Sequence, residues 1–315
     1  MTDRMQISDD APVVLPGLPP SLGAEFGFGP LAFEGIDNGP VFAAHGAGLR
    51  AEETCVFHRT VPSGDAYVAL LAGRVEAAIK NRAALPVVRF ADGEYAFYCG
   101  SLKCNGLYQQ AENVAAIRAA FPAHAKALKE LSETGLLAPL LFPGNTRKRS
   151  LGEKLLGKKK GTDGGLRFLE FLASGEVSLT GANYIPFYAV YAYLSGARFA
   201  AAVNGKKVCV VNSDFNVKEC ASWFARAGSY PSLFHAPLPD SFVATRWASM
   251  AESVLGAIPS DVDCIMTGAG VGALEVCVDA ARKFRVPAID SGHIINAMNG
   301  LESKSKGPRL FTFRR

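Results

Sequence analysis

The sequence predicts an α/β protein: a mostly parallel, Rossmann-like sheet with flanking helices, preceded by an irregular N-terminal extension. Three apolar stretches in the last third of the chain show no alternation of apolar and polar residues. This pattern is typical of strands buried on both faces of a parallel sheet. Segments of helical periodicity separate the stretches, as expected for repeated strand–helix–strand units. The three predicted strands cover residues 207–213, 262–268 and 286–292.

The first part of the chain is less regular. Residues 1–64 are rich in Gly and Pro, and we expect an extension there with short strands near 41–44 and 54–59. The main domain is expected to cover residues 65–315.

A helix is expected over 65–83, where apolar side chains recur at helical spacing and Ser63 or Asp65 can cap the first turn. Pro86 then opens a strand that ends at Phe90. Further helices are expected over 111–134 (with an interruption at Pro122 and a stop at Gly135), 166–173, 183–194, 217–227, 245–258 and 272–284, with a short strand or loop over 235–242.

Composition narrows the class of protein. The 315 residues are 49% hydrophobic and 20% charged, with a net charge of +4, which is ordinary for a soluble protein and too small to indicate nucleic-acid binding. No apolar run is long enough to span a membrane, and the N-terminus lacks the order of a signal peptide. The seven cysteines are scattered without a CxxC pair, which favours reduced thiols in the cytoplasm.

A basic, glycine-rich segment interrupts the domain at residues 143–165. It has few apolar side chains, so we expect an exposed loop or short helix. One interpretation is a solvated surface. The other is a lid over phosphates or a peripheral contact with an anionic partner.

The stretch VVRFADGEYAFY, residues 87–98, ends an apolar strand on two carboxylates. On an extended backbone Asp92 and Glu94 would point the same way and converge on one cation, with Gly93 between them. Mg²⁺ or Mn²⁺ would keep both carboxylates ionised and would bind substrate phosphates as well. Arg89 would reach the same cleft, where its guanidinium suits a diphosphate. The alternative is a simple turn capped by Asp92.

A second candidate site follows the strand at 262–268. Gly268, Gly270 and Ala273 fit the dinucleotide-binding pattern G-x-G-x-x-A, and Asp290 lies about twenty residues further on, where that pattern has an acidic ribose ligand. Glycines at such a turn, here with Ala269 between them, let backbone amides approach a phosphate. An NAD-binding oxidoreductase is therefore one alternative, and a tight turn without a ligand is another.

Two more strand ends carry polar groups. His293 follows Gly292 beside Asp290, and Asp214 follows the strand at 207–213. Because ligands bind off the carboxyl ends of strands in parallel sheets, these side chains are candidates for the site. Asp214, Asp290 and His293 are the candidates for a catalytic base.

The motifs RFADGE (89–94) and DSGH (290–293), in this order and about 200 residues apart, resemble the first and last motifs of the GT-D type glycosyltransferases. That bacterial family was first catalogued as a domain of unknown function. The segment HAPLPDSF (235–242) resembles a middle segment of the family more loosely. The similarity spans roughly residues 65–300.

This resemblance implies a metal-dependent transferase of the GT-D fold that moves a sugar from a nucleotide-sugar donor, typically a UDP-sugar, to a hydroxyl of a glycan or glycoconjugate. It implies that Asp92 and Glu94 lie at the Mn²⁺ or Mg²⁺ ion and the diphosphate. A non-catalytic homologue that binds a nucleotide sugar is the remaining alternative. The donor, the acceptor, the stereochemical outcome and the oligomeric state are left open.

Overall fold

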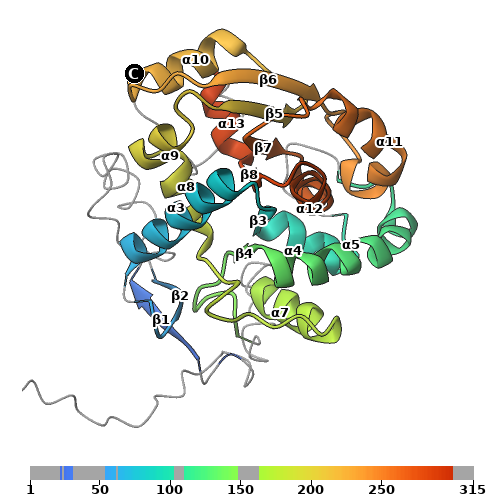
Figure 1. The fold of residues 1–315 in the computed structure, drawn as a ribbon. Coiled ribbons are helices and arrows are strands. Elements are labelled where there is room, and N and C mark those ends of the chain that lie inside the picture. The colour runs from blue at the N-terminus through green and yellow to red at the C-terminus, as the bar shows by residue number, and fades with distance from the viewer. Residues whose placement is uncertain are drawn as a thin grey trace, which may run out of the picture.

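A parallel sheet of six strands lies at the centre of the structure, a computed structural model that describes Leu22 and residues 25–30, 54–61, 63–102, 110–147 and 163–300 (Figure 1). The strand order is β4-β3-β8-β7-β5-β6, and every neighbouring pair is parallel. The strands are β3 (Leu85–Phe90), β4 (Leu136–Pro139), β5 (Lys207–Asn212), β6 (Ser232–Pro237), β7 (Cys264–Gly268) and β8 (Pro287–Asp290). The predicted fold class is confirmed.

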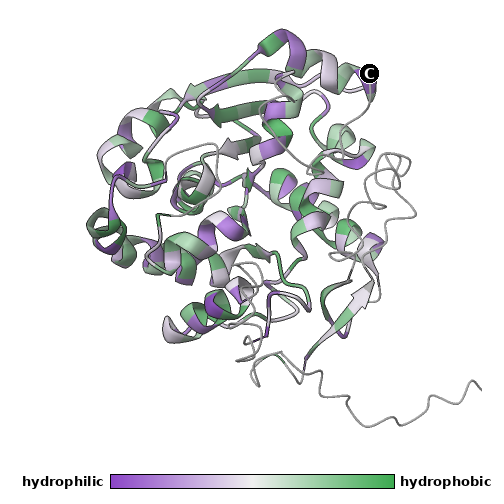
Figure 2. Ribbon diagram, turned by 180° about the vertical axis from the view of Figure 1, so that it is seen from behind, coloured by the Kyte–Doolittle hydropathy of each residue, from purple (hydrophilic) through white to green (hydrophobic). Residues whose placement is uncertain are grey.

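Burial explains why the strands lack alternation. Every residue of β3, β4 and β8 is buried, since helices cover both faces of the sheet. The outer strand β6 is only partly buried. Figure 2 shows the consequence along the chain: the strands are mostly hydrophobic, whereas the surrounding helices mix hydrophobic and hydrophilic residues.

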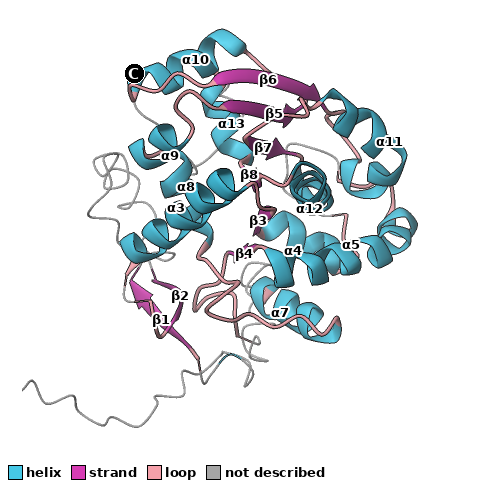
Figure 3. Cartoon of the chain, in the orientation of Figure 1, coloured by secondary structure: helices cyan, strands magenta, loops and turns pink. Residues whose placement is uncertain are grey.

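Helices pack on both faces of the sheet (Figure 3). One face carries α3 (Gly64–Asn81), α8 (Phe187–Leu194) and α9 (Ala197–Ala202), and the other carries α5 (Val114–Thr134), α11 (Val243–Ala257) and α12 (Ala273–Phe284). The remaining helices are α4 (Asp92–Tyr98), α7 (Gly164–Ser174), α10 (Val217–Arg226) and α13 (Gly292–Met298), with a short 3-10 turn, η1 (Gly270–Gly272). Helix α7 packs on α4, and α10 packs on α13.

Local sequence signals explain the start of α3 but not the course of α5. Ser63 caps α3 as expected, because its side chain accepts a hydrogen bond from the backbone nitrogen of Ala66 at 3.2 Å. Pro122, however, does not interrupt the helix in which it lies: α5 runs unbroken from Asn113, its N-cap, to Thr134. The predicted break is therefore wrong, because the packing of α5 against α11 and α12 outweighs the one backbone hydrogen bond that a proline removes.

Two short strands precede the main domain. β1 (Phe26–Pro30) and β2 (Thr54–His58) form an antiparallel pair, so the strand expected near 54–59 is confirmed. Val56 ties this pair to the rest of the structure: its nitrogen donates to the carbonyl of Leu141 at 3.0 Å, and its carbonyl accepts from the Tyr184 hydroxyl at 2.6 Å. The strand expected near 41–44 and residues 148–162 of the basic segment lie outside the described residues.

None of the helices in the described ranges combines the length and the apolar character that crossing a bilayer requires.

A matched pair of glycines tests the packing at the start of the sheet. At Gly135, between α5 and β4, an added Cβ would lie 2.2 Å from the Pro86 carbonyl oxygen of β3. At Gly73, on the exposed side of α3, an added Cβ meets nothing within 4 Å. We predict that Gly135→Ala lowers the free energy of unfolding by about 2 kcal/mol or more, because the backbone of β3 must shift. Gly73→Ala should raise it by about 0.5–1 kcal/mol through helix propensity. Urea unfolding of both variants checks this, and equal effects would contradict the packing at Gly135.

Candidate functional site

The predicted site residues gather at one edge of the sheet. Because all six strands are parallel, their carboxyl ends share that edge. The RFADGE motif leaves β3 there, and the DSGH motif leaves β8, the strand beside it. The glycine turn leaves β7, which is the next strand along. Segments about 200 residues apart in the sequence are thus neighbours in space.

The DGE sequence begins a helix and not an extended turn. Asp92 and Glu94 are in the first turn of α4, with Ala91 as the N-cap residue, so their side chains do not share one face as they would on a strand. Glu94 turns back, and its Oε2 accepts a hydrogen bond from the Ala91 nitrogen at 2.8 Å. The expectation of an extended backbone here was wrong, because this hydrogen bond starts a helix directly after Phe90. Asp92 is exposed, and Glu94 is partly buried.

The environment of Glu94 is unfavourable for a negative charge. Burial and the nearby carboxylates of Asp290 and Asp92 raise the pKa of Glu94 to about 7, although the hydrogen bond from Ala91 opposes the rise. Three carboxylates therefore lie within electrostatic reach of one another. At neutral pH Glu94 exists as a mixture of its protonated and ionised forms, and a nearby cation would favour the ionised one.

A buried ion pair joins the two motifs. The Arg89 side chain is 6% exposed and its Nη2 lies 2.9 Å from Oδ1 of Asp290, whose side chain is 8% exposed. Arg89 Nε also donates to the Asp290 carbonyl at 2.9 Å. Burial alone would lower the pKa of Arg89, but Asp290 and Tyr191 raise it above its ordinary value, so the guanidinium keeps its charge. Burial raises the pKa of Asp290, and Arg89 offsets part of that rise.

Aromatic rings and a glycine enclose this ion pair. The Arg89 guanidinium carbon lies 4.3 Å from the ring centroid of Tyr191 and 5.2 Å from that of Phe187. Gly292 has a φ of 24°, and a Cβ at this position would lie 2.5 Å from Arg89 Nη2. The glycine of DSGH thus gives the arginine room to reach Asp290. In this structure the guanidinium is directed at Asp290, whereas its assignment to a diphosphate stays a prediction.

His293 and Asp214 lie at the same edge of the sheet. His293 is in the first turn of α13 directly after β8 and is partly buried. Asp214 follows β5 in a loop that two asparagines hold: its carbonyl accepts from Asn212 Nδ2 at 2.9 Å and from Asn299 Nδ2 at 2.7 Å. Both residues are therefore where the sequence placed them, at strand ends, and their roles in the chemistry stay predictions.

The glycine turn already contains a polar group from the protein itself. The Val271 nitrogen donates to Oε1 of Gln110 at 3.0 Å. Gly270 has a φ of 54°, and a Cβ there would lie 2.5 Å from Gln110 Nε2. The amide of Gln110 thus fills the space that the glycine leaves and binds a backbone donor that the sequence pattern assigned to a phosphate. Asp290, the expected ribose ligand of that pattern, is buried against Arg89, so this feature no longer favours an NAD-binding oxidoreductase.

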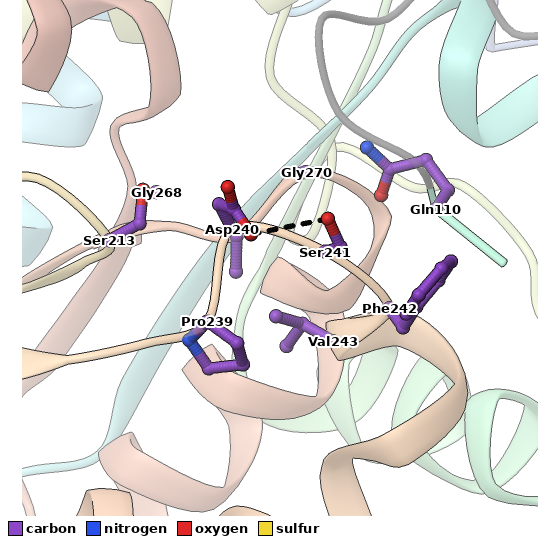
Figure 4. Close-up of a pocket in the computed structure, with 10 residues that line it drawn as sticks. Gln110, Ser213, Pro239, Asp240, Ser241, Phe242, Val243, Gly268 and Gly270 are labelled. Atoms are coloured by element: carbon purple, nitrogen blue, oxygen red, sulfur yellow. Dashed lines mark hydrogen bonds between the residues drawn. The ribbon is translucent and has the colours of Figure 1, made fainter.

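A pocket opens beside this turn, between the loop after β6 and the ends of β5 and β7 (Figure 4). The segment at 235–242 entered the sequence predictions only through a loose resemblance, and Asp240, Ser241 and Gln110 were not among the predicted site residues. The Pro-Asp-Ser-Phe sequence at 239–242, between a strand and a helix, is the signal that could have pointed to Asp240 and Ser241, whereas Gln110 has no such local signal. The pocket is lined by Gln110, Ser213, Pro239, Asp240, Ser241, Phe242, Val243, Gly268, Ala269 and Gly270.

The side chains around the DGE helix offer few donors for a metal ion. Among the described residues, no group of three or more His, Cys, Asp or Glu side chains is arranged to hold a metal ion. Asp92 is exposed, and Glu94 keeps one carboxylate oxygen beyond the one that caps α4. Mg²⁺ is commonly held by one or two carboxylates together with substrate phosphates. Among the described residues these oxygen donors do not form a metal site of the protein alone, and a cation here would need substrate phosphates as further ligands.

Comparison with known proteins gives a distant structural similarity. No protein-family model matches the chain, and no curated protein sequence matches it. Similar solved structures include a selenomethionine-substituted structure of domain of unknown function 1792, which has 16% identity and a TM-score of 0.45 and covers 78% of this chain and 83% of its own. A second structure, with 16% identity and a TM-score of 0.45, covers 80% of this chain and 88% of its own. It is described as showing that this domain has a distinct glycosyltransferase fold. These descriptions name the type of domain that the motifs resemble, but the similarity is too distant to say anything about the reaction of this chain.

The buried Arg89–Asp290 ion pair should contribute to the stability of the fold. Asp290→Asn leaves the Arg89 guanidinium buried without a counter-charge, so we expect the free energy of unfolding to fall by about 3 kcal/mol. Asp261→Asn removes a partner of Lys207 on the surface, where the side chain of Asp261 is 64% exposed, and should leave stability unchanged within error. Chemical denaturation of both variants measures the difference. An Asp290→Asn protein as stable as the control would contradict a structural role for the pair.

The raised pKa of Glu94 should make the stability of the folded protein depend on pH. Its pKa of about 7 in the folded protein lies above the ordinary value of 4.5, so the folded state binds more protons than the unfolded state between these values. The stability contributed by protonated Glu94 is complete below about pH 4.5 and is lost as the pH rises through about 7. Glu94→Gln stays uncharged and keeps an oxygen that accepts from Ala91.

We therefore expect the stability of Glu94→Gln relative to the unmodified protein to increase by about 1–3 kcal/mol from pH 5 to pH 8. Unfolding curves at pH 5, 6, 7 and 8 measure it. Glu133→Gln, which changes an exposed carboxylate of α5, serves as the control and should give a flat difference. A flat difference for Glu94→Gln as well would show that its pKa is ordinary.

Proposed function

We propose that this protein is a glycosyltransferase that takes a sugar from a nucleotide-sugar donor, with UDP as the first nucleotide to test, and transfers it to a hydroxyl of a glycan or glycoconjugate. One observation carries the proposal. The two motifs that resemble the GT-D type transferases leave adjacent strands and are joined by the buried Arg89–Asp290 pair. This arrangement brings the ADGE helix and the DSGH turn to one edge of the sheet, where ligands of α/β proteins bind.

In this proposal Asp92 and Glu94 hold the donor diphosphate through Mn²⁺ or Mg²⁺. A divalent ion bound there would neutralise the charge that develops on the leaving nucleoside diphosphate. Asp92 is the accessible ligand. Glu94 joins it as an ionised carboxylate, so cation affinity should increase as the pH rises through about 7.

The remaining residues of the motifs have positioning or proton-transfer roles in this proposal. Arg89 and Asp290 fix β3 and β8 relative to each other, and Gly93 keeps the first turn of α4 free of a further side chain. His293, partly buried at the start of α13, is the preferred candidate to contact the phosphates or to accept a proton from the acceptor hydroxyl. Asp214 is the second candidate for the base. The 268–270 turn would receive a phosphate only after Gln110 has moved away from Val271.

Calorimetric titration with UDP in the presence and absence of Mn²⁺ tests the metal assignment. We expect the double variant Asp92→Asn, Glu94→Gln to lose at least about 100-fold of its Mn²⁺-dependent UDP affinity, which is about 2.7 kcal/mol, with a melting temperature at pH 7 that is not lowered, because Gln cannot ionise where Glu94 is disfavoured as an anion. Glu133→Gln, an equally conservative change of an exposed carboxylate, should bind UDP normally. Equal UDP affinity in the double variant and the control would contradict the assignment of Asp92 and Glu94 as metal ligands.

Turnover is measured separately. Release of the nucleoside diphosphate from a panel of nucleotide sugars should be detectable in the unmodified protein and reduced at least about tenfold in His293→Ala. If no donor is turned over and no nucleoside diphosphate binds, the protein is not a transferase of this type.

A further inference from the structure

A nucleotide whose diphosphate is bound at the ADGE helix is long enough to reach the pocket at residues 239–243 and 268–270. Helix α4 packs against η1, the turn that borders the pocket. The strand that precedes α4 is two strands away from β7 in the sheet order, which is about 10 Å at the usual spacing of strands. The pocket is therefore close to the proposed phosphate position but distinct from it.

The walls of this pocket come from four distant parts of the chain, and contacts between some of them fix its shape. Glu112, close to Gln110 in the sequence, accepts a hydrogen bond from Thr245 Oγ1 at 2.7 Å and forms an ion pair with Arg246, so the segment at 110–112 is tied to α11. Gln110 in turn accepts from Val271. These contacts mean that the pocket is formed before any ligand enters.

The start of α11, directly after the loop that follows β6, is also held against the glycine turn. A Cβ on Gly272 would lie 2.6 Å from Cγ1 of Val243, the first residue of α11, so the helix start and the turn are in direct contact. Phe242, the N-cap residue of α11, has a φ of 63° and a ψ of 17°, a left-handed conformation that is costly for an aromatic residue. Backbone strain of this kind persists where the surroundings enforce it and is concentrated at ligand sites.

The polar groups of the pocket select for a ligand that donates hydrogen bonds. Asp240 is exposed, and its Oδ1 accepts from Ser241 at 3.2 Å, which leaves the carboxylate able to accept further hydrogen bonds. Ser213 adds a hydroxyl. The Val271 amide at the glycine turn already donates to Gln110. None of the described residues that line the pocket is basic. A phosphate would meet a carboxylate here, whereas a pair of hydroxyls would find acceptors.

We propose that this pocket binds the ribose of the nucleotide-sugar donor and that Asp240 accepts hydrogen bonds from the 2′- and 3′-hydroxyls. The inference rests on the proposed function. In dinucleotide-binding folds an acidic residue performs this task at the end of a neighbouring strand. Here the residue in that place, Asp290, is buried against Arg89. Asp240 is the exposed carboxylate on the other side of the glycine turn, and it replaces Asp290 as the ribose ligand.

The test compares nucleotides that differ in one hydroxyl. Dissociation constants are measured by calorimetry for UDP and 2′-deoxy-UDP, and for ADP, CDP and GDP with their 2′-deoxy forms, in Mn²⁺. We expect the unmodified protein to prefer the ribonucleotide at least about tenfold for the base that it binds best. This preference should disappear in Asp240→Ala and should be reduced in Asp240→Asn, which keeps the size of the side chain and one accepting oxygen but loses the charge. Glu252→Ala removes an exposed carboxylate from α11 and should retain the full preference. Melting temperatures establish that all variants are folded.

Four results would overturn the inference. If ribo- and deoxyribonucleotides bind equally to the unmodified protein, or if the preference survives in both Asp240 variants, the ribose lies elsewhere while the proposed function stands. The transferred sugar also carries neighbouring hydroxyls. If Asp240→Ala weakens the binding of UDP-glucose but not the binding of UDP, the pocket holds that sugar and not the ribose. If no nucleoside diphosphate binds to any form of the protein and no donor is turned over, the proposed function fails together with the inference.

Discussion

The candidate site depends on one buried ion pair. Arg89 and Asp290 belong to adjacent strands and come from segments about 200 residues apart, and their side chains are 6% and 8% exposed. Two charges removed from water are costly unless each has its partner and further hydrogen bonds. The pair satisfies this condition through the Asp290 carbonyl and through the Tyr191 and Phe187 rings. Since neither charge is tolerated alone, the pair specifies how β3 and β8 align. The positions of α4 and α13, and thus of Asp92, Glu94 and His293, follow from that alignment.

The same pair explains how carboxylates near one another can differ in chemistry. Asp290 has a guanidinium beside it, whereas Glu94 has two carboxylates nearby. Burial and these carboxylates raise the pKa of Glu94 to about 7, although the Ala91 amide opposes the rise. Asp92 is exposed to solvent. A bound cation with its phosphates would complete the arrangement, because it supplies the positive charge that Glu94 lacks. Thus the Arg89 guanidinium supplies the positive charge beside Asp290, and a cation bound together with the substrate would supply the positive charge beside Glu94.

The sequence predicted β3, β5, β7, β8 and most of the helices, because burial on both faces leaves continuous apolar runs and helical periodicity is local. It did not predict β4, and it left the region of β6 as a strand or a loop. The prediction from sequence was wrong where a single hydrogen bond determines the backbone conformation. Ala91 lacks the side-chain oxygen that normally marks a helix N-cap, so the helix that Glu94 starts was mistaken for an extended turn. The positions of His293 and Asp214 at strand ends could be read from the sequence. The pairing of Arg89 with Asp290 and the insertion of Gln110 at Gly270 could not, because both join distant segments whose contact has no local signature.

The place of β8 in the sheet has a consequence for how this protein is made. Among the described residues β8 is the last strand in sequence, and it lies between β3, the first strand of the sheet, and β7. Until residues 287–290 have left the ribosome, the edges of β3 and β7 that face this place have no partner in the sheet. Exposed strand edges can pair with other chains, and contacts of such long range form slowly. The sheet can therefore be completed only after β8 has been synthesised, and β8 brings with it Asp290, the counter-charge of Arg89.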